Sequence, residues 1–254
     1  THAWGVPYGA TREPGSFGRL SLAELPLPNR GDPGVPRFVP GRPDDAGATT
    51  VAADRTGDCL TGVDLVGGDR VIAVGARGTT WQSSVARNDW QCAGAGTQFN
   101  LQRVQFVDRE RGWAVGGWSR DKRVALCGGM GIILSTNDGG HTWKPSWQAK
   151  GAWFYDLCFV RPQIGYVCGG YGTVMKTTDG GHTWQGPLST GTNSWLYGVH
   201  FVDENQGWVV GTHETLLHTR DGGKTWKSQT ADGWRRPRDL RERLRSVDFV
   251  DSSH

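Results

Sequence analysis

Long apolar runs are missing from this 254-residue sequence, and the absence of any stretch of 18 apolar residues predicts no transmembrane helix. Charge of one sign is also scarce. The net charge of +3 is too small to indicate a nucleic-acid-binding protein. No phosphate-binding glycine loop and no Ser-His-Asp pattern is evident. No signal peptide is visible, and the chain starts at Thr1 rather than Met. That start suggests a processed N-terminus, and hence export or organelle import, with a cloning boundary as the alternative.

Cysteine is limited to five residues, and none has the CxxC or Cys/His spacing of a metal site. We therefore expect no metal and no cofactor. Cys158 and Cys168 flank one predicted hairpin turn, and counting outward from the turn lets them face each other. A disulfide and a pair of buried thiols both fit this pattern. The odd number leaves at least one thiol unpaired within the chain.

Glycine and tryptophan are abundant, with 39 and 13 residues, and they mark a nine-residue motif that occurs three times. The motif occupies residues 135–143, 176–184 and 218–226, and its aspartates lie 41 and then 42 residues apart. A period in the 40s with short apolar runs is typical of a β-propeller blade. The recurring motif residues are Asp138, Gly140 and Trp143, then Asp179, Gly181 and Trp184, then Asp221, Gly223 and Trp226.

Each motif ends a longer unit that predicts four short antiparallel strands, which is one blade. The predicted first strands are 104–108, 157–160 and 199–203, and the second strands are 112–116, 165–169 and 207–211. A degenerate copy without Asp-Gly-Gly begins at Leu60, and a fifth copy begins at Leu244. The sequence thus predicts an all-β propeller of about four blades plus a fifth begun. Either the N-terminal segment, further residues or a partner would complete the ring.

The motif has a structural interpretation. An aspartate accepts hydrogen bonds from backbone N–H groups two or three residues on, and the two glycines supply the positive φ of a tight hairpin. The tryptophan then packs between sheets. Because the same residues recur in every repeat, they cannot all face one active site. We therefore expect no catalytic role for them.

Two regions lie outside the repeat. Residues 1–58 hold eight of the twelve prolines and show no periodicity, so we expect an extended arm on a partner subunit, beside a propeller domain at 59–254. An insertion at 234–245 holds six arginines against two acids. Its arginines are either a docking patch for an acidic surface or a solvated loop. The candidate docking residues are Arg235, Arg236, Arg238 and Arg241.

The unit Val-x-Phe-Val-Asp, Gly-Trp-x-Val-Gly and Thr-x-Asp-Gly-Gly-x-Thr-Trp resembles the photosystem II stability/assembly factor family, over roughly residues 60–251. These proteins are similar to sialidase-type propellers with Asp-box (BNR) repeats. The resemblance implies a scaffold or accessory subunit that docks on a membrane-associated photosynthetic complex without catalysis. It also implies an extracytoplasmic location, in a periplasm or thylakoid lumen or as a secreted protein. The family's propeller usually has seven blades, and this chain stops earlier.

Two other functions compete with this interpretation. A glycoside hydrolase needs a paired acid and nucleophile, and a sialidase also needs three arginines on separate blades. The sequence shows neither arrangement, so no enzyme is expected. A lectin would use tryptophans outside the motifs to stack on sugar rings. Those tryptophans are Trp118, Trp147, Trp153, Trp195 and Trp234.

Overall fold

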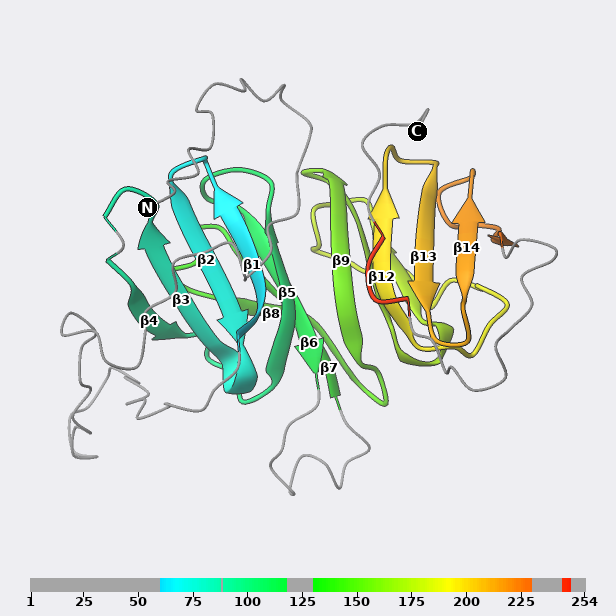
Figure 1. Ribbon diagram of the computed structural model, residues 1–254, viewed down its shortest axis with the longest axis horizontal. Coiled ribbons are helices and arrows are strands. Elements are labelled where there is room, and N and C mark those ends of the chain that lie inside the picture. Colours follow the sequence, from blue (N-terminus) through cyan, green and yellow to red (C-terminus); the bar gives the residue numbers. More distant parts are fainter. Residues whose placement is uncertain (1–59, 88, 118–129, 230–243, 248–254) are drawn as a thin grey trace, which may run out of the picture.

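The computed structural model describes residues 60–87, 89–117, 130–229 and 244–247, which form four small antiparallel sheets standing side by side (Figure 1). The first two sheets contain β1 (Leu60–Val66), β2 (Arg70–Gly75), β3 (Thr79–Ser84), β4 (Gln91–Gly94), β5 (Asn100–Phe106), β6 (Gly112–Gly117), β7 (Met130–Thr136) and β8 (Lys144–Lys150). The other two contain β9 (Phe154–Arg161), β10 (Ile164–Gly169), β11 (Val174–Thr177), β12 (Leu196–Phe201), β13 (Gly207–Gly211), β14 (Leu216–Thr219) and β15 (Lys227–Ser228). We call these sheets blade 1 (β1 to β4), blade 2 (β5 to β8), blade 3 (β9 to β11) and blade 4 (β12 to β15). The predicted all-β, blade-built fold is confirmed.

Within each blade the strands pair in chain order, as a meander. Blade 3 has three full strands, and its predicted fourth strand is reduced to a single bridge between Lys176 and Gln185. Pro187 follows that bridge and cannot donate a ladder hydrogen bond. The backbone then regains contact where the Leu188 N–H donates to the Val174 carbonyl at 2.8 Å.

The first strand of each blade lies beside the first strand of the next, in the order β1, β5, β9, β12. One repeat position links these neighbours. Asp64 accepts from the Phe106 N–H at 2.6 Å, Gln105 accepts from the Phe159 N–H at 2.7 Å, and Cys158 accepts from the Phe201 N–H at 3.4 Å. The side chain before the phenylalanine position therefore ties each blade to the backbone of the next.

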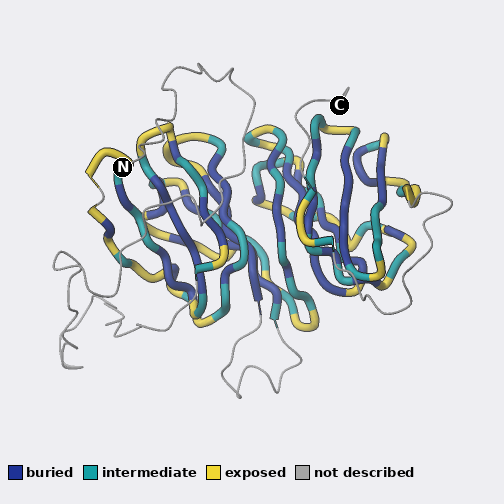
Figure 2. Tube along the Cα trace, viewed as in Figure 1, coloured by how far each residue is buried: buried dark blue, intermediate teal, exposed yellow. Residues whose placement is uncertain are grey.

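The core is a repeated aromatic arrangement between blades. Figure 2 shows long dark-blue stretches of buried residues in the strands that face neighbouring blades. Phe159 stacks on Trp113 of the preceding blade, with ring centroids 3.7 Å apart, and meets Trp184 edge-on at 6.1 Å. Phe201 repeats this with Tyr166 at 3.5 Å and Trp226 at 6.1 Å. Each phenylalanine thus joins the motif tryptophan of its own blade to the second strand of the blade before it.

The predicted facing of Cys158 and Cys168 is wrong. The register of β9 and β10 places Tyr166 opposite Cys158 and Asp156 opposite Cys168. The Cys158 sulfur contacts the Phe201 backbone and the Cys168 Sγ donates to the Leu196 carbonyl at 3.4 Å, so each thiol points at blade 4 at a different height. Both residues are thiols rather than a disulfide.

Residues 244–247 lie against blade 4. This is where the first strand of a fifth blade, predicted to begin at Leu244, would start. The Leu244 N–H donates to the Gly211 carbonyl at 3.1 Å. A Cβ placed on Gly198 of β12 would stand 3.2 Å from the Ser246 Cα, so the two backbones approach closely. Among the described residues, no helix has the length and apolar character needed to cross a membrane.

Candidate functional site

The Asp-box turn of blade 2 is closed by its own side chains. The Asp138 carboxylate accepts from the Thr142 N–H at 2.9 Å, from the Thr142 hydroxyl at 2.5 Å and from the Thr136 hydroxyl at 2.8 Å. The Thr136 hydroxyl in turn accepts from the Gly140 N–H at 2.9 Å. The acid therefore bonds to the backbone four residues on, not two or three as the sequence indicated. Both of its oxygens are used within the hairpin.

The other two Asp-boxes repeat this geometry. Thr183 donates from N and Oγ1 to Asp179 at 2.9 and 2.6 Å, and Thr225 donates to Asp221 at 2.9 and 2.5 Å. The glycines adopt the expected left-handed backbone, with φ of 72° at Gly180. The equivalent positive φ values are 74° at Gly139, 88° at Gly140, 81° at Gly181, 70° at Gly222 and 87° at Gly223.

These hydrogen bonds keep the acids ionised. Hydrogen bonds from Thr183 bring the pKa of Asp179 to about 2 from an ordinary 3.8, and those from Thr225 do the same to the pKa of Asp221. Partial burial raises the pKa of Asp138, but the Thr142 and Thr136 hydrogen bonds outweigh it and bring the value to about 2. A general acid needs a raised pKa, so these carboxylates are unsuited to protonating a leaving group.

A further acid in the described region is also held structurally. Asp156 is buried at 4% exposure on β9, accepts from the Val199 N–H at 3.0 Å and lies 3.5 Å from the Arg103 Nε. It therefore links blades 2, 3 and 4. Among the described residues, no group of three His, Cys, Asp or Glu side chains is arranged to hold a metal ion.

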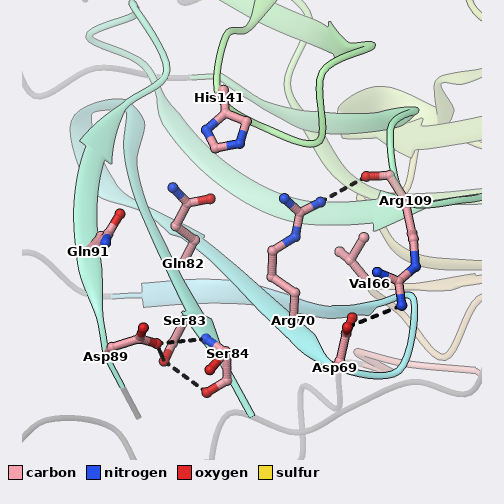
Figure 3. Close-up of a pocket in the computed structure, with 10 residues that line it drawn as sticks. All are labelled: Val66, Asp69, Arg70, Gln82, Ser83, Ser84, Asp89, Gln91, Arg109 and His141. Atoms are coloured by element: carbon pink, nitrogen blue, oxygen red, sulfur yellow. Dashed lines mark hydrogen bonds and ion pairs between the residues drawn. The ribbon is translucent and has the colours of Figure 1, made fainter. Parts of the chain in front are cut away.

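A groove of about 410 Å³ opens between blades 1 and 2, beside the Asp-box of blade 2 (Figure 3). We call it the blade 1–2 groove. Its lining residues are Val66, Asp69, Arg70, Gln82, Ser83, Ser84, Asp89, Gln91, Arg109 and His141. Figure 3 shows Arg70 at its centre, between the His141 ring and the Arg109 backbone.

Some charged side chains of this groove have a partner of their own and others do not. Arg109 pairs with Asp69 at 3.1 Å, and Asp89 accepts from the Ser84 N–H at 3.0 Å. Arg70 donates to the Arg109 carbonyl at 2.8 Å, and within the described part of the chain no carboxylate forms an ion pair with it. The groove is therefore suited to binding an anionic group through Arg70.

Asp89 stabilises the β3–β4 hairpin of blade 1, which has no Asp-Gly-Gly motif. It closes the β3–β4 hairpin from the far side of the turn, through Ser84 and through the Ser83 hydroxyl at 3.3 Å. The Ser84 N–H holds the pKa of Asp89 below its ordinary value. The sequence assigns residues 88–91 to the hairpin of this degenerate copy, but Asp89 stands at a different place in the turn, so comparison with the other blades does not predict its role.

Of the tryptophans considered for sugar stacking, Trp153 and Trp195 lie together, with ring centroids 5.1 Å apart. Trp147 instead packs on Phe154 at 5.2 Å, between blades 2 and 3. Three tyrosines that the sequence analysis did not single out join the pair, at positions 155, 171 and 197. A usable signal existed, because the equivalent positions of blade 2 carry Asn100 and Gln102.

The remaining predicted site residues fall outside the described residues. They are the arm at 1–58, Trp118, Trp234 and the arginines Arg235, Arg236, Arg238 and Arg241. Their proposed roles stay predictions.

Comparison with known proteins gives a consistent picture of the fold. The model of the family described as "Photosynthesis system II assembly factor YCF48" matches residues 186–253. A search of curated proteins finds no match. The structure of YCF48 from Cyanidioschyzon merolae is 14% identical, with a TM-score of 0.54, over 76% of this chain and 61% of that one. This chain therefore spans less than two thirds of that protein.

Two further solved structures match parts of this chain. The GH74 enzyme of Niastella koreensis is 16% identical, with a TM-score of 0.50, over 69% of this chain and 30% of that one. A structure titled "YCF48 bound to D1 peptide" is 14% identical, with a TM-score of 0.41, over 68% of this chain and 82% of that one. The blades and the Asp-boxes show a BNR-type propeller fold similar to that of YCF48, and the assembly-factor family model matches its C-terminal part.

Proposed function

We propose that this chain is a non-catalytic accessory or assembly subunit that docks on a larger, membrane-associated complex of the photosynthetic type. The observation that carries the proposal is the match of residues 186–253 to the assembly-factor family, on a chain whose blades have the same fold. A propeller fold alone would not choose a function, since the GH74 enzyme shares it.

The chemistry of the described acids supports a binding role. The three Asp-box carboxylates are committed to their own turns, and Asp156 is committed to neighbouring strands. Glycoside hydrolysis by the usual route needs one carboxyl group with a raised pKa and a second as nucleophile or base. The recurring acids have lowered pKa values instead, near 2.

The contacts are assigned to three regions. The blade 1–2 groove offers Arg70 to a carboxylate of the partner. The predicted arm at 1–58 and the arginines Arg235, Arg236, Arg238 and Arg241 are the other two candidates. With this role we propose a location outside the cytoplasm, in a periplasm or thylakoid lumen or as a secreted protein.

Charge reversal tests the arginine contact. Replacing the four arginines by glutamate should weaken association with the complex while the circular dichroism spectrum stays unchanged, since surface charges steer and orient association. Arg70→Glu should give a smaller loss, because one cation is reversed instead of four. Unchanged association in both variants would remove these contacts from the proposal.

A second candidate function is carbohydrate binding, favoured by the approach of Trp153 and Trp195. Stacking of sugar rings on tryptophan faces would use this pair. A glycan array probed with the labelled chain separates the alternatives. Strong, saturable binding to a defined glycan favours the lectin, and its absence together with recovery of a membrane complex favours the docking subunit.

A further inference from the structure

Five aromatic side chains gather where the inner strands of blades 3 and 4 begin, and we call them the aromatic surface: Trp153, Tyr155, Tyr171, Trp195 and Tyr197. Their ring centroids lie 4.9 to 6.3 Å apart in a connected chain from Tyr171 to Tyr197. None is fully buried, and Tyr171 is 60% exposed. Four of the rings are partly buried and Tyr171 is exposed, and a contiguous aromatic patch that stays in reach of solvent marks an interaction surface.

The repeat itself shows that the fold does not require these rings. Asn100 of blade 2 occupies the position of Trp153 and Trp195, and Gln102 occupies that of Tyr155 and Tyr197. Asn100 satisfies the turn of blade 1 with a plain hydrogen bond, accepting from the Arg77 N–H at 3.0 Å. Polar residues can therefore form the same junction between blades. The aromatic residues at these positions of blades 3 and 4 have a role other than holding the blades together.

Tyr171 adds a second observation. It follows β10 in a left-handed backbone conformation, with φ of 57°, and its counterparts Arg77 and His213 have φ of 54° and 56°. The turn geometry is therefore common to blades 1, 3 and 4, and what distinguishes blade 3 is the aromatic side chain that the turn carries. Glycine would relax this position, yet the chain keeps a large, exposed ring there.

We propose that the aromatic surface is the docking site for the segment Leu25–Pro28 of this chain's own N-terminal region. The segment reads Leu-Pro-Leu-Pro and carries no charge, as none of the five rings does. Proline-containing segments are recognised by aromatic-lined grooves, because the extended polyproline conformation loses little entropy on binding. The rings of Trp153 and Trp195 are tilted by 55° and those of Tyr155 and Tyr197 by 66°. Neither pair is coplanar, so the rings do not form one flat platform for a sugar ring.

The chain outside the described residues has the reach and the entry point for this contact. Leu60 begins β1 as Leu196 begins β12, and Figure 1 shows both strands starting at the same end of the blades. Leu60 therefore lies at the end that carries Trp195, the residue before Leu196. Residues 29–59 span up to about 100 Å when extended. The proposal needs only a short part of residues 1–59 and is independent of the proposed function, since it concerns a contact within one chain.

Oxidative footprinting of the full-length chain tests it, with mass spectrometry reading modification of Tyr171 and Trp195. Trp81, a partly exposed ring on blade 1, serves as the internal reference. The variant Leu25→Ser/Leu27→Ser should raise oxidation of both rings several-fold over the unmodified chain, because the docked segment is released. The matched variant Val35→Ser/Val39→Ser, in another proline-flanked stretch, should leave oxidation unchanged.

Each other outcome overturns the proposal. Equal oxidation in all three chains means that Leu25–Pro28 does not cover the rings. An equal rise in both variants means that another part of the segment does. Protection that fades on dilution assigns the contact to a second copy. Protection of the rings by cello-oligosaccharide, equal in the unmodified chain and in the Leu25→Ser/Leu27→Ser variant, assigns the surface to a sugar.

Discussion

The two ends of the blades differ in how strictly they repeat. At the Asp-box end, blades 2, 3 and 4 use the same threonine, aspartate and glycine with hydrogen bonds that agree to about 0.1 Å. At the opposite end, equivalent positions carry Asn100, Trp153 and Trp195. Uniform residues are those that every blade needs to fold, so the function of this chain is to be sought where the blades differ.

Breaking a shared core position should have the largest effect. Phe159→Ala removes a fully buried ring that contacts Trp113 and Trp184, and it should lower the free energy of unfolding by about 3–5 kcal/mol. Urea denaturation measures the change. Val85→Ala, at a side chain that is 51% exposed, is the control and should change stability by under about 0.5 kcal/mol. A small loss at Phe159 would contradict the aromatic arrangement between blades.

The shared turn should be next in size. Thr177→Val keeps the shape of a fully buried side chain but removes the hydroxyl that accepts from the Gly181 N–H and donates to Asp179. Leaving that buried N–H without an acceptor should cost about 1–3 kcal/mol in unfolding free energy. Thr177→Ser retains the hydroxyl and should recover most of the loss. Equal losses in both variants would assign the effect to packing.

Lowering the pH should weaken the Asp-box end of the blades, because its three turns depend on ionised carboxylates, whereas the five rings of the aromatic surface carry no charge. The Asp-box acids have folded-state pKa values near 2, below the ordinary 3.8, so they stabilise the fold above pH 4 and lose that contribution as the pH falls toward 2. The melting temperature should drop over this window. Asp138→Asn should start lower and drop less, because one such carboxylate is missing. Parallel pH profiles would show that Asp138 contributes nothing to the acid loss.

The aromatic surface should matter least for stability. Trp195→Ala should change the free energy of unfolding by under about 1 kcal/mol. Leu196→Ala, the next residue and fully buried, should cost about 2–5 kcal/mol. Thermal denaturation of the two variants compares adjacent positions of one strand. A larger loss at Trp195 would mean that the ring belongs to the core.

The sequence predicted the blades because their signals are local. Strand alternation, the Gly-Gly turns and the tryptophans recur at a fixed period, and each is read within one hairpin. It did not predict the role of Asp89, because that acid reaches its hairpin from a different position in the turn. The Cys158–Cys168 facing was predicted wrongly because the turn pairs Ile164 with Arg161, and a bulge at Ile164/Gly165 shifts the register by one residue more.

Sites formed between blades were harder to predict for a related reason. Arg70 and His141 are 71 positions apart in a chain whose blade 1 lacks the motif, so no spacing connects them. The aromatic surface combines residues from two blades, and its signal is a departure from the repeat, visible only when Trp153 is compared with Asn100. Comparing blades with one another is therefore more informative about function than any single motif.

Purification of the tagged chain from its native membranes, followed by identification of the co-migrating proteins, tests the central claim that this propeller acts by binding. We predict recovery of the protein subunits of a membrane complex at a fixed ratio to the chain. A chain that migrates alone and releases reducing sugar from a polysaccharide with steady turnover would contradict the account.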